Sequence, residues 1–427
     1  MIPLLGILFA CRPPTADPAL VATARLSAPI PTDPRVQTGV MKNGMTWFVQ
    51  HNEQPDDRVV LRLVVDAGSI LEDEDQRGIA HLVEHMAFNG TDRFPGNGVV
   101  QYLESIGASF GPHVNAHTSF DETVYKLTVP SNDPVALGRA LDVLEDWAGG
   151  ISFDPAAVDG ERGVVLEEWR RNQGAGFRLM LQTLSATYGE AYANRLPIGT
   201  RESLETFDPA VVSRFYRDWY RPELMAVIAV GDVDADAMAA ELVARFGDLK
   251  SPDRPRERVR VDMPSFAERK VLVVTDAELT ATTVSYGRVF DDREGNTHAH
   301  ARQNAVEQLM LGMLGERLGD LSRSPDRPFL SAGAGPDRLS PTQSARFLNA
   351  RARKGGAERA LEAVLTEWVR AMNHGFNPGE LTRAKAEELA GWDERLAQID
   401  DQESVGEAEE LVRVFTNGEY YTAMEYE

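Results

Sequence analysis

The sequence predicts an α+β protein of two domains, and three observations lead to this fold class. Strand-like and helix-like patterns occur in separate blocks rather than in strict alternation, which is typical of α+β domains. The first and the second region both place strands before helices, although they share no close sequence repeat. Residues 251–265, SPDRPRERVRVDMPS, are rich in proline and charge, which indicates a linker between the two regions.

The first region, residues 35–250, holds the clearest elements. Residues 123–130 (TVYKLTVP) alternate between apolar and polar side chains, as a half-buried strand does. Residues 133–150 form an amphipathic pattern that opens with Asp133 and Pro134 and closes with two glycines, which are helix start and stop signals. By the same criteria we expect further strands at 43–52, 58–69 and 225–233, and further helices at 77–88, at 97–107, from 154 onward and at 234–247.

The second region, residues 266–427, begins with two strand-like runs in ERKVLVVTDAELTATTVSYGRV. Long helical patterns follow at 296–320, 355–374 and 377–416, and the last residues, VFTNGEYYTAMEYE, contain no closing element. We therefore expect a second domain that is incomplete at its C-terminus, either in a naturally half-sized protein or in a fragment of a longer one.

The composition limits the classes of function. The chain has 427 residues, of which 43% are hydrophobic and 26% are charged, as expected of a globular protein with sizeable cores. The formal net charge of −22 repels nucleic acid, and no basic stripe with interleaved aromatic residues offsets it. We therefore expect no nucleic-acid partner.

The first 34 residues resemble a targeting segment followed by a tether. Residues 1–10 are an apolar run, too short to span a bilayer, that ends in LFAC with Cys11, the one cysteine of the chain. This pattern resembles the end of a bacterial lipoprotein signal, which predicts an exported protein that is periplasmic or anchored to a membrane through lipidated Cys11. No basic segment precedes the run and Phe9 is bulky for the cleavage motif, so an ordinary N-terminal tail is the alternative. Residues 12–34 are rich in Pro, Ala and Thr, which indicates a tether.

Residues 81–85, HLVEH, carry the most specific chemical pattern. His81 and His85 are one helical turn apart on one face, so both imidazoles can reach one metal ion. Glu84 lies beside them, where its carboxylate can act as a general base toward an activated water. The alternative is a polar patch on an ordinary helix, because a five-residue match can occur by chance. The apolar flanks favour the metal site, since three polar side chains without partners are costly in a buried helix.

A catalytic zinc site needs a third protein ligand. In ERGVVLEEW (161–169), Glu161 and Glu168 share a helix face and lie about 10.5 Å apart along its axis. Both cannot bind one ion directly, so one is a candidate ligand and the other a candidate supporting residue. Glu167 points elsewhere on the helix, and the alternative for all three glutamates is that they are solvated surface charges.

The chain resembles the pitrilysin/insulinase-like zinc metallopeptidases, the inverzincins, whose signature is H-x-x-E-H. The similarity covers roughly residues 36–427 and is closest to long bacterial members. It rests on the segments AGSILEDEDQRGIAHLVEHMAFNGT, FGPHVNAHTSFDETVYKLTVP, ERGVVLEEWR, FYRDWYRPELMAVIAVGDV and TDAELTATTVSYGRV.

The resemblance implies a role for each candidate residue. Three ligands, His81, His85 and Glu168, would hold one zinc ion per chain. Glu84 would be the general base beside them, and Glu161 would be a carboxylate that supports the site from behind. Glu167 stays a rival for the third ligand, because the spacing from His85 is longer than the commonest spacing in the family. Asn115 and Ala116 match the family's edge strand, to which an extended peptide adds through main-chain hydrogen bonds.

Family members resemble a clam shell of two halves, and each half holds two related domains with antiparallel-dominated sheets packed against helices. This chain is similar to the zinc-bearing first half. The implied function is a zinc endopeptidase for extended or small unfolded peptides, completed by a second half that is a second subunit, another copy or further sequence. The alternatives are a non-catalytic zinc-bearing partner or scaffold subunit, and a module that holds peptides at 115–118 without cutting them.

Overall fold

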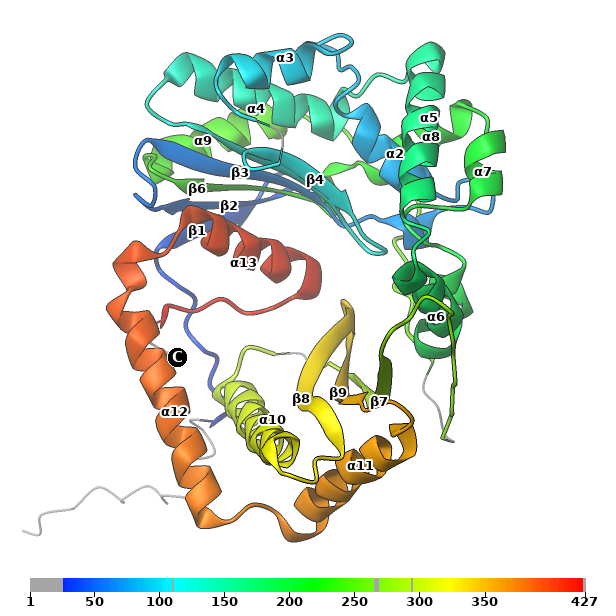
Figure 1. Ribbon diagram of the computed structural model, residues 1–427. Helices are drawn as coiled ribbons and strands as arrows, with labels where there is room; N and C mark the ends of the chain where they lie inside the picture. Colours follow the sequence, from blue (N-terminus) through cyan, green and yellow to red (C-terminus); the bar gives the residue numbers. More distant parts are fainter. Residues whose placement is uncertain (1–25, 110, 265–268, 293–294, 425–427) are drawn as a thin grey trace, which may run out of the picture.

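The computed structural model describes residues 26–424 except residues 110, 265–268 and 293–294 (Figure 1). Cys11 and the predicted targeting segment lie outside the described residues. Two sheets, in which nearly all neighbouring strands are antiparallel, pack against helices. The predicted α+β fold class is therefore confirmed.

The first sheet has six strands in the order β1-β2-β6-β3-β5-β4. All neighbours are antiparallel except β2 and β6, which are parallel. The strand β6 reads MAVIAVG and is buried along its whole length, as expected of a central strand that is covered on both faces. The strands are β1 (Val36–Val40), β2 (Thr46–His51), β3 (Arg58–Val65), β4 (Val114–Thr118), β5 (Thr123–Pro130) and β6 (Met225–Gly231).

Most helices of the first region lie on one face of this sheet, drawn above it in Figure 1. Asp133 and Asp154 cap the helices that follow them, since each side chain accepts hydrogen bonds from two backbone N–H groups. The helices are α2 (Ile79–Met86), α3 (Gly98–Ser105), α4 (Pro134–Gly149), α5 (Pro155–Arg171), α6 (Ala175–Ala193), α7 (Arg201–Thr206), α8 (Ala210–Trp219) and α9 (Ala235–Phe246), with short 3-10 turns at Ser69–Leu71 and Pro222–Leu224.

The opposite face of the first sheet is covered by α13 (Ser404–Asn417), the last of the described helices. Leu411 and Val412 of this helix pack against a separate apolar cluster of the sheet that includes Val64 and Ile228. A segment of the second region thus completes the core of the first. The division into 35–250, a linker at 251–265 and 266–427 stays a prediction.

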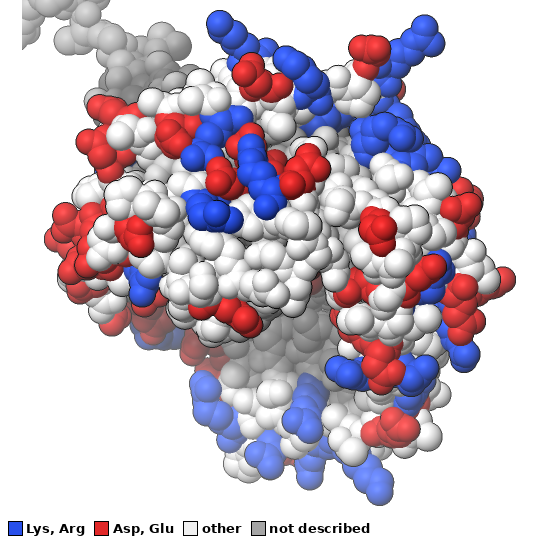
Figure 2. All heavy atoms as spheres, turned by 90° about the horizontal axis from the view of Figure 1, so that it is seen from above, with Lys and Arg blue, Asp and Glu red and all other residues white. Residues whose placement is uncertain are grey.

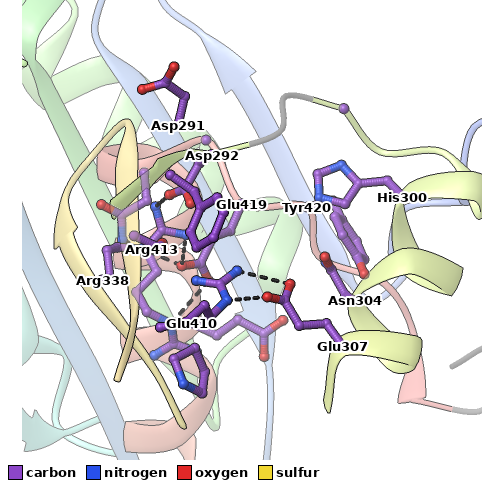
Figure 3. Close-up of a pocket in the computed structure, with 17 residues that line it drawn as sticks. Asp291, Asp292, His300, Asn304, Glu307, Arg338, Glu410, Arg413, Glu419 and Tyr420 are labelled. Atoms are coloured by element: carbon purple, nitrogen blue, oxygen red, sulfur yellow. Dashed lines mark hydrogen bonds and ion pairs between the residues drawn. The ribbon is translucent and has the colours of Figure 1, made fainter. Parts of the chain in front are cut away.

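The second sheet has three antiparallel strands in the order β7-β9-β8. Its strands are β7 (Thr282–Asp291), β8 (Phe329–Ser340) and β9 (Gln343–Ala352), and its helices are α10 (His298–Arg323), α11 (Ala357–His374) and α12 (Pro378–Ala397). A polar cleft lies between α10, this sheet and the end of α13 (Figure 3). Its arginines are paired with acidic side chains; for example, Arg346 binds Glu307 of α10.

Three predictions for the second region differ from the structure. The strand-like run at residues 271–274 belongs to no strand. Conversely, β8 and β9 lie where the sequence predicts no strand. The helix predicted over 377–416 is divided into α12 and α13 by a 3-10 turn at Ile399–Asp401. The first discrepancy has a physical reason, because a strand needs a neighbouring strand and no described strand lies beside this run.

Charges of both signs are mixed over the helical side of the first region (Figure 2). Many of them pair between elements, as Arg245 of α9 does with Asp142 of α4 at 2.5 Å. This face therefore presents no single basic field of the kind that binds nucleic acid. Among the described helices, none combines the length and the apolar character needed to cross a membrane.

Candidate metal centre

The helix α2 is fixed in the core by its apolar side chains. Leu82, Val83 and Met86 have no exposed surface. Gly78, which precedes the helix, has φ of 90°, and a Cβ atom there would lie 3.0 Å from the Cα atom of Gly199. Both the left-handed backbone and the close approach therefore require glycine at this position.

A buried carboxylate holds the N-terminus of α2. Glu72 accepts hydrogen bonds from the backbone N–H groups of Gly78 (3.1 Å) and Ala80 (2.9 Å). These groups have no partner inside the helix, and a carboxylate suits the positive end of a helix. Burial nevertheless raises the pKa of the Glu72 carboxyl well above its ordinary value. No pattern in the sequence points to Glu72, which lies outside the H-x-x-E-H motif.

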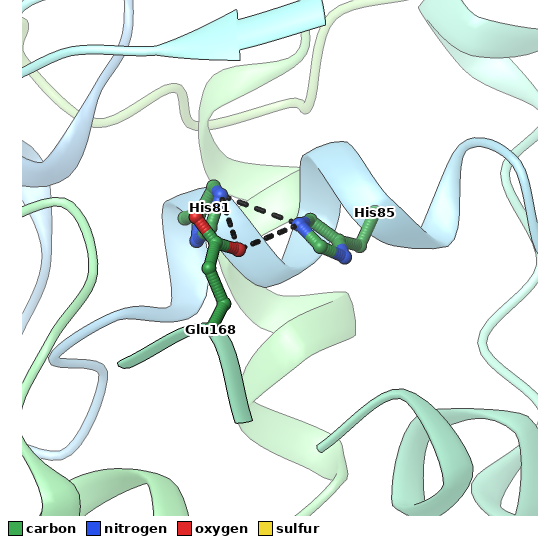
Figure 4. A group of neighbouring side chains, drawn as sticks. All are labelled: His81, His85 and Glu168. Atoms are coloured by element: carbon green, nitrogen blue, oxygen red, sulfur yellow. Dashed lines mark hydrogen bonds and ion pairs between the residues drawn. The ribbon is translucent and has the colours of Figure 1, made fainter. Parts of the chain in front are cut away.

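Three predicted ligands meet in space (Figure 4). The Nε2 atoms of His81 and His85 lie 3.3 Å apart. Oε2 of Glu168, from α5, lies 3.8 Å from Nε2 of His81 and 3.7 Å from Nε2 of His85. Within the described residues, this is the one group of three or more His, Cys, Asp or Glu side chains whose spacing suits a metal ion.

This donor set fits zinc. A tetrahedral zinc ion with bonds of about 2.0–2.1 Å places neighbouring ligand atoms roughly 3.3 Å apart, close to the observed separations. Burial and the neighbouring His85 lower the pKa of His81 to about 3. His81 is therefore neutral near pH 7, which is the form of imidazole that binds metals. Two histidines and one carboxylate leave a fourth position open, as in catalytic zinc sites.

Glu161 supports the site from behind His85. Its Oε1 accepts a hydrogen bond from His85 Nδ1 at 2.7 Å, and its Oε2 accepts one from Asn89 at 2.8 Å. Because the carboxylate fixes the proton on Nδ1, the lone pair of His85 Nε2 is left facing the cluster. Burial alone would lower the pKa of His85, but the hydrogen bond that His85 donates to Glu161 and the nearby carboxylates together raise it.

Glu84 lies on the same helix, 7% exposed, and one of its oxygens is already bound. The hydroxyl of Thr118 on β4 donates to Glu84 Oε2 at 2.5 Å. Burial raises the pKa of the Glu84 carboxyl, although the hydrogen bond from Thr118 opposes this shift. Thr118 lies in the segment FGPHVNAHTSFDETVYKLTVP, but the sequence predicts no role for it, since only the fold shows which side chain its hydroxyl reaches.

Asn115 and Ala116 lie on β4, the edge strand of the first sheet that ends at Thr118. This strand pairs with β5, and no described strand pairs with its other edge. The Asn115 side chain is turned back onto its own strand and accepts a hydrogen bond from the N–H group of Ala116 at 2.9 Å. The fold thus places an open strand edge next to α2.

Glu167 and the two histidines near Asn115, His113 and His117, lie outside the cluster. Glu167 is paired with Arg170 and with Arg171, so the rival third ligand is engaged elsewhere. His113 contacts Ser109, and His117 lies 3.6 Å from Glu122.

An H-x-x-E-H helix, a glutamate from a second helix and an antiparallel-dominated sheet together define the class of inverzincin-type metallopeptidase domains. Two family models match the chain: "Insulinase (Peptidase family M16)" over residues 47–196, and "Peptidase M16 inactive domain" over residues 206–388. The chain belongs to the insulinase family, peptidase family M16.

Similar proteins are described as zinc proteases. The probable zinc protease PqqL of Haemophilus influenzae is 36% identical over 305 residues, which are 71% of this chain and 33% of that protein. The probable zinc protease PqqL of Escherichia coli is 31% identical over 383 residues, which are 87% of this chain and 40% of that protein.

The fold matches the same group. The crystal structure of the periplasmic protease PqqL from E. coli has a TM-score of 0.86 and 28% identity, covering 93% of this chain and 44% of that one. A structure of the first half of the same protein also has a TM-score of 0.86, and 85% of it is covered. The chain therefore spans about two fifths or less of the length of these curated relatives and most of one solved half.

Proposed function

We propose that the protein is a zinc-dependent endopeptidase that hydrolyses extended or small unfolded peptides. The observation that carries this proposal is the convergence of two helices. Two imidazole nitrogens from α2 and one carboxylate oxygen from α5 lie within 3.8 Å of each other, with Glu84 on the same helix as the imidazoles.

Zinc held by His81, His85 and Glu168 would supply a Lewis acid that activates water and polarises the carbonyl of the peptide bond. Glu84 acts as the general base: its free oxygen takes a proton from the attacking water and passes it to the departing amine nitrogen. The hydrogen bond from Thr118 holds the other oxygen, so the carboxylate is fixed before substrate arrives.

The peptide binds along the open edge of β4 at Asn115 and Ala116. An extended chain that pairs with this edge is held by main-chain hydrogen bonds, which are independent of side-chain identity. The adjacent position of β4 and α2 supports this placement, because a peptide on the strand runs past the helix that carries Glu84.

The test compares the parent protein with Glu84→Gln. Bound zinc is measured by elemental analysis, and hydrolysis is measured with a quenched-fluorescent library of unstructured peptides. We expect the variant to retain zinc and to lose at least about a hundredfold in kcat, since a positioned acid–base group contributes this much. If the parent binds no zinc, the assignment of the site is wrong.

Full activity is proposed to need a second half, which is a second subunit, another copy or further polypeptide. The support is the span of the relatives, since the solved E. coli protein is more than twice as long as the part that matches this chain. A parent protein that binds zinc but cleaves nothing, even with its second half added, would favour the rival function of a non-catalytic zinc-bearing partner subunit.

Export to the periplasm is proposed from the E. coli relative, whose structure is described as that of a periplasmic protease. A lipid on Cys11 would tether the protein to a membrane there. Mass spectrometry of the N-terminus from membrane-fraction protein tests this point. A diacylated Cys11 at the N-terminus supports the tether, and an unmodified Met1 rules it out.

A further inference from the structure

Asn89 lies in the turn that follows α2, and it continues the face of that helix that carries the two histidines. His81, His85 and Asn89 are four residues apart, and side chains at this spacing lie one above the other. The chain keeps turning beyond Met86, the last residue of α2, since the N–H group of Asn89 donates to the carbonyl of Met86 at 3.0 Å. The face of α2 that meets α5 therefore extends one step past the H-x-x-E-H motif.

The polar side chains of α2 and α5 form a ladder in which the two helices run in opposite directions. His81 and His85 face Glu168 at one end, and Asn89 reaches Glu161 at the other. At a helical rise of about 1.5 Å per residue, Glu161 and Glu168 lie about 10.5 Å apart along α5. His81 and Asn89 lie about 12 Å apart along the axis of α2. The two spans are similar, so a side chain at position 89 can reach the carboxylate that supports the site.

Asn89 binds the oxygen of Glu161 that His85 leaves free. Oε1 of Glu161 accepts the hydrogen bond from Nδ1 of His85 at 2.7 Å, on the side of the ring away from Glu168 (Figure 4). Oε2 accepts one from Nδ2 of Asn89 at 2.8 Å, and the Glu161 side chain is 14% exposed. These are the two donors found for this carboxylate among the described residues. Two donors at fixed positions set the plane of the carboxylate, whereas one donor leaves it free to turn.

We infer that Asn89 is a positioning residue of the metal centre, which acts through Glu161 on His85; the inference rests on the zinc site proposed above. Without the amide, Oε2 of Glu161 is left without a donor in a largely buried place, which favours rotation of the carboxylate toward solvent. Oε1 then leaves Nδ1 of His85, and the ring is no longer held with Nε2 toward the ion. Outer partners of this kind change metal affinity because they set the orientation and the tautomer of the ligand.

A purely structural role for Asn89 is the alternative, because Nδ2 also donates to the carbonyl oxygen of His85 at 3.2 Å, near the end of α2. This contact satisfies one of the carbonyl groups that a helix end leaves without a partner. The two roles predict different effects. A helix cap changes the stability of the protein, whereas positioning through Glu161 changes the zinc affinity and does so only while Glu161 is present.

The test is a double-mutant cycle on the zinc affinity of the whole chain, measured by competition with a fluorescent zinc chelator at fixed pH. Asn89→Leu keeps the approximate size of the side chain and removes the donor. We expect it to weaken zinc binding about three- to tenfold, less than the roughly 10–100-fold expected for the direct partner of a ligand. In a Glu161→Ala background it should change the affinity by less than about twofold, because the residue through which it acts is gone. Alanine is used at position 161 because a glutamine there could still bind the amide of Asn89.

Asn43→Leu is the matched control. The side-chain amide of Asn43 also donates to main-chain oxygens, those of Phe246 and Leu249 at 2.8 and 3.2 Å, but Asn43 lies in the turn between β1 and β2. We expect this variant to lower the melting temperature of the zinc-free protein without changing the zinc affinity. Thermal unfolding of zinc-free Asn89→Leu measures its effect on stability on the same scale.

The outcomes separate this inference from the proposed function. An unchanged zinc affinity in Asn89→Leu, or an equal loss with and without Glu161, would overturn the inference and leave the zinc site as proposed. A loss of affinity in Asn43→Leu equal to that in Asn89→Leu would also overturn it, because the loss would then follow from lower stability. A parent that binds zinc and shows the expected cycle, but cleaves no peptide even with its second half, contradicts the proposed function alone. A parent that binds no zinc contradicts both.

Discussion

Three glutamates on α5 meet different surroundings, although their side chains are chemically identical. Glu168 faces the two histidines, Glu161 binds His85 from behind, and Glu167 is paired with arginines of its own helix. We expect Glu168→Gln to weaken zinc binding most and Glu161→Gln to weaken it by about 10–100-fold, as loss of a supporting partner does. Glu167→Gln should leave the zinc affinity unchanged.

Competition with a fluorescent zinc chelator at fixed pH measures this series. The three variants make the same chemical change on one helix, so a general loss of helix stability would affect them alike. Equal effects of Glu167→Gln and Glu168→Gln would contradict the assignment of the third ligand.

Thr118 is the one described side chain found to donate a hydrogen bond to Glu84. Thr118→Val keeps the shape of the side chain and removes the hydroxyl, so we expect kcat to fall about tenfold or more with KM little changed, because a hydrogen bond to a charged group contributes about 1.5–3 kcal/mol. Thr118→Ser keeps the donor and should restore most of kcat. Steady-state kinetics with the best library peptide measures both, and a Ser variant as slow as the Val variant would argue against this role.

At the residue scale, the sequence predicted which candidate ligands lie together better than which side chains hold them in place. His81, His85 and Glu168 do lie together, because helical spacing and a known motif restrict where such side chains can meet. Thr118 and Glu72 were not given roles, since their contacts join segments 34 and 6–8 residues apart through loops whose paths no periodicity predicts.

The start of α12 is held by an ion pair that makes its stability depend on pH. Arg317 of α10 binds Glu380 through two contacts, at 2.6 and 2.8 Å, and Glu380 also completes a capping box with Asn377. The hydrogen bond from Arg317, followed by the smaller contributions of Asn377 and nearby charge, lowers the pKa of Glu380 to about 2.

A carboxyl group with a lowered pKa contributes stability above its ordinary pKa of 4.5, and that stability is lost as the pH falls toward 2. We expect the melting temperature of the parent to fall as the pH is lowered from 4.5 toward 2. The melting temperature of Glu380→Gln should be lower than that of the parent at pH 7 and should fall less over the same range. Asp320→Asn is the control, because its pair with Arg323 is largely exposed and contributes little. Parallel curves for the parent and Glu380→Gln would show that this pair does not titrate as described.

At the element scale, strands of the second sheet were the hardest to predict. β8 reads FLSAGAGPDRLS, in which glycines and a proline hide any alternation of apolar and polar side chains. It is stabilised by pairing with β9 rather than by its own propensity. Residues 271–274 show the opposite case, a strong strand pattern without a described neighbour.

At the scale of the whole molecule, α13 joins the second region to the first. The helical periodicity of its sequence does not identify the surface against which it packs. Leu411 is 2% exposed and lies against the first sheet. Leu411→Ala should reduce the free energy of unfolding by about 2–5 kcal/mol, because it leaves a cavity in a core shared by both regions. Val405→Ala, on the same helix but 41% exposed, should change it by less than about 1 kcal/mol.

Urea unfolding followed by tryptophan fluorescence and by circular dichroism measures both variants. We expect the two signals to report one transition in the parent, since the first sheet cannot lose α13 without exposing an apolar face. If the parent instead shows two separate transitions and Leu411→Ala shifts only the one at higher urea concentration, α13 is not required for the stability of the whole first sheet.

The position of α13 also affects how the chain acquires its fold during synthesis. The strands that α13 covers are complete once Gly231 has emerged, but the helix begins only at Ser404. At 5–20 residues per second, a ribosome needs roughly 10–35 s to make the intervening polypeptide. Throughout that interval the apolar side chains of one face of the first sheet lack the helix that covers them in the folded protein, so this face is the surface of the nascent chain most in need of shielding from other apolar surfaces.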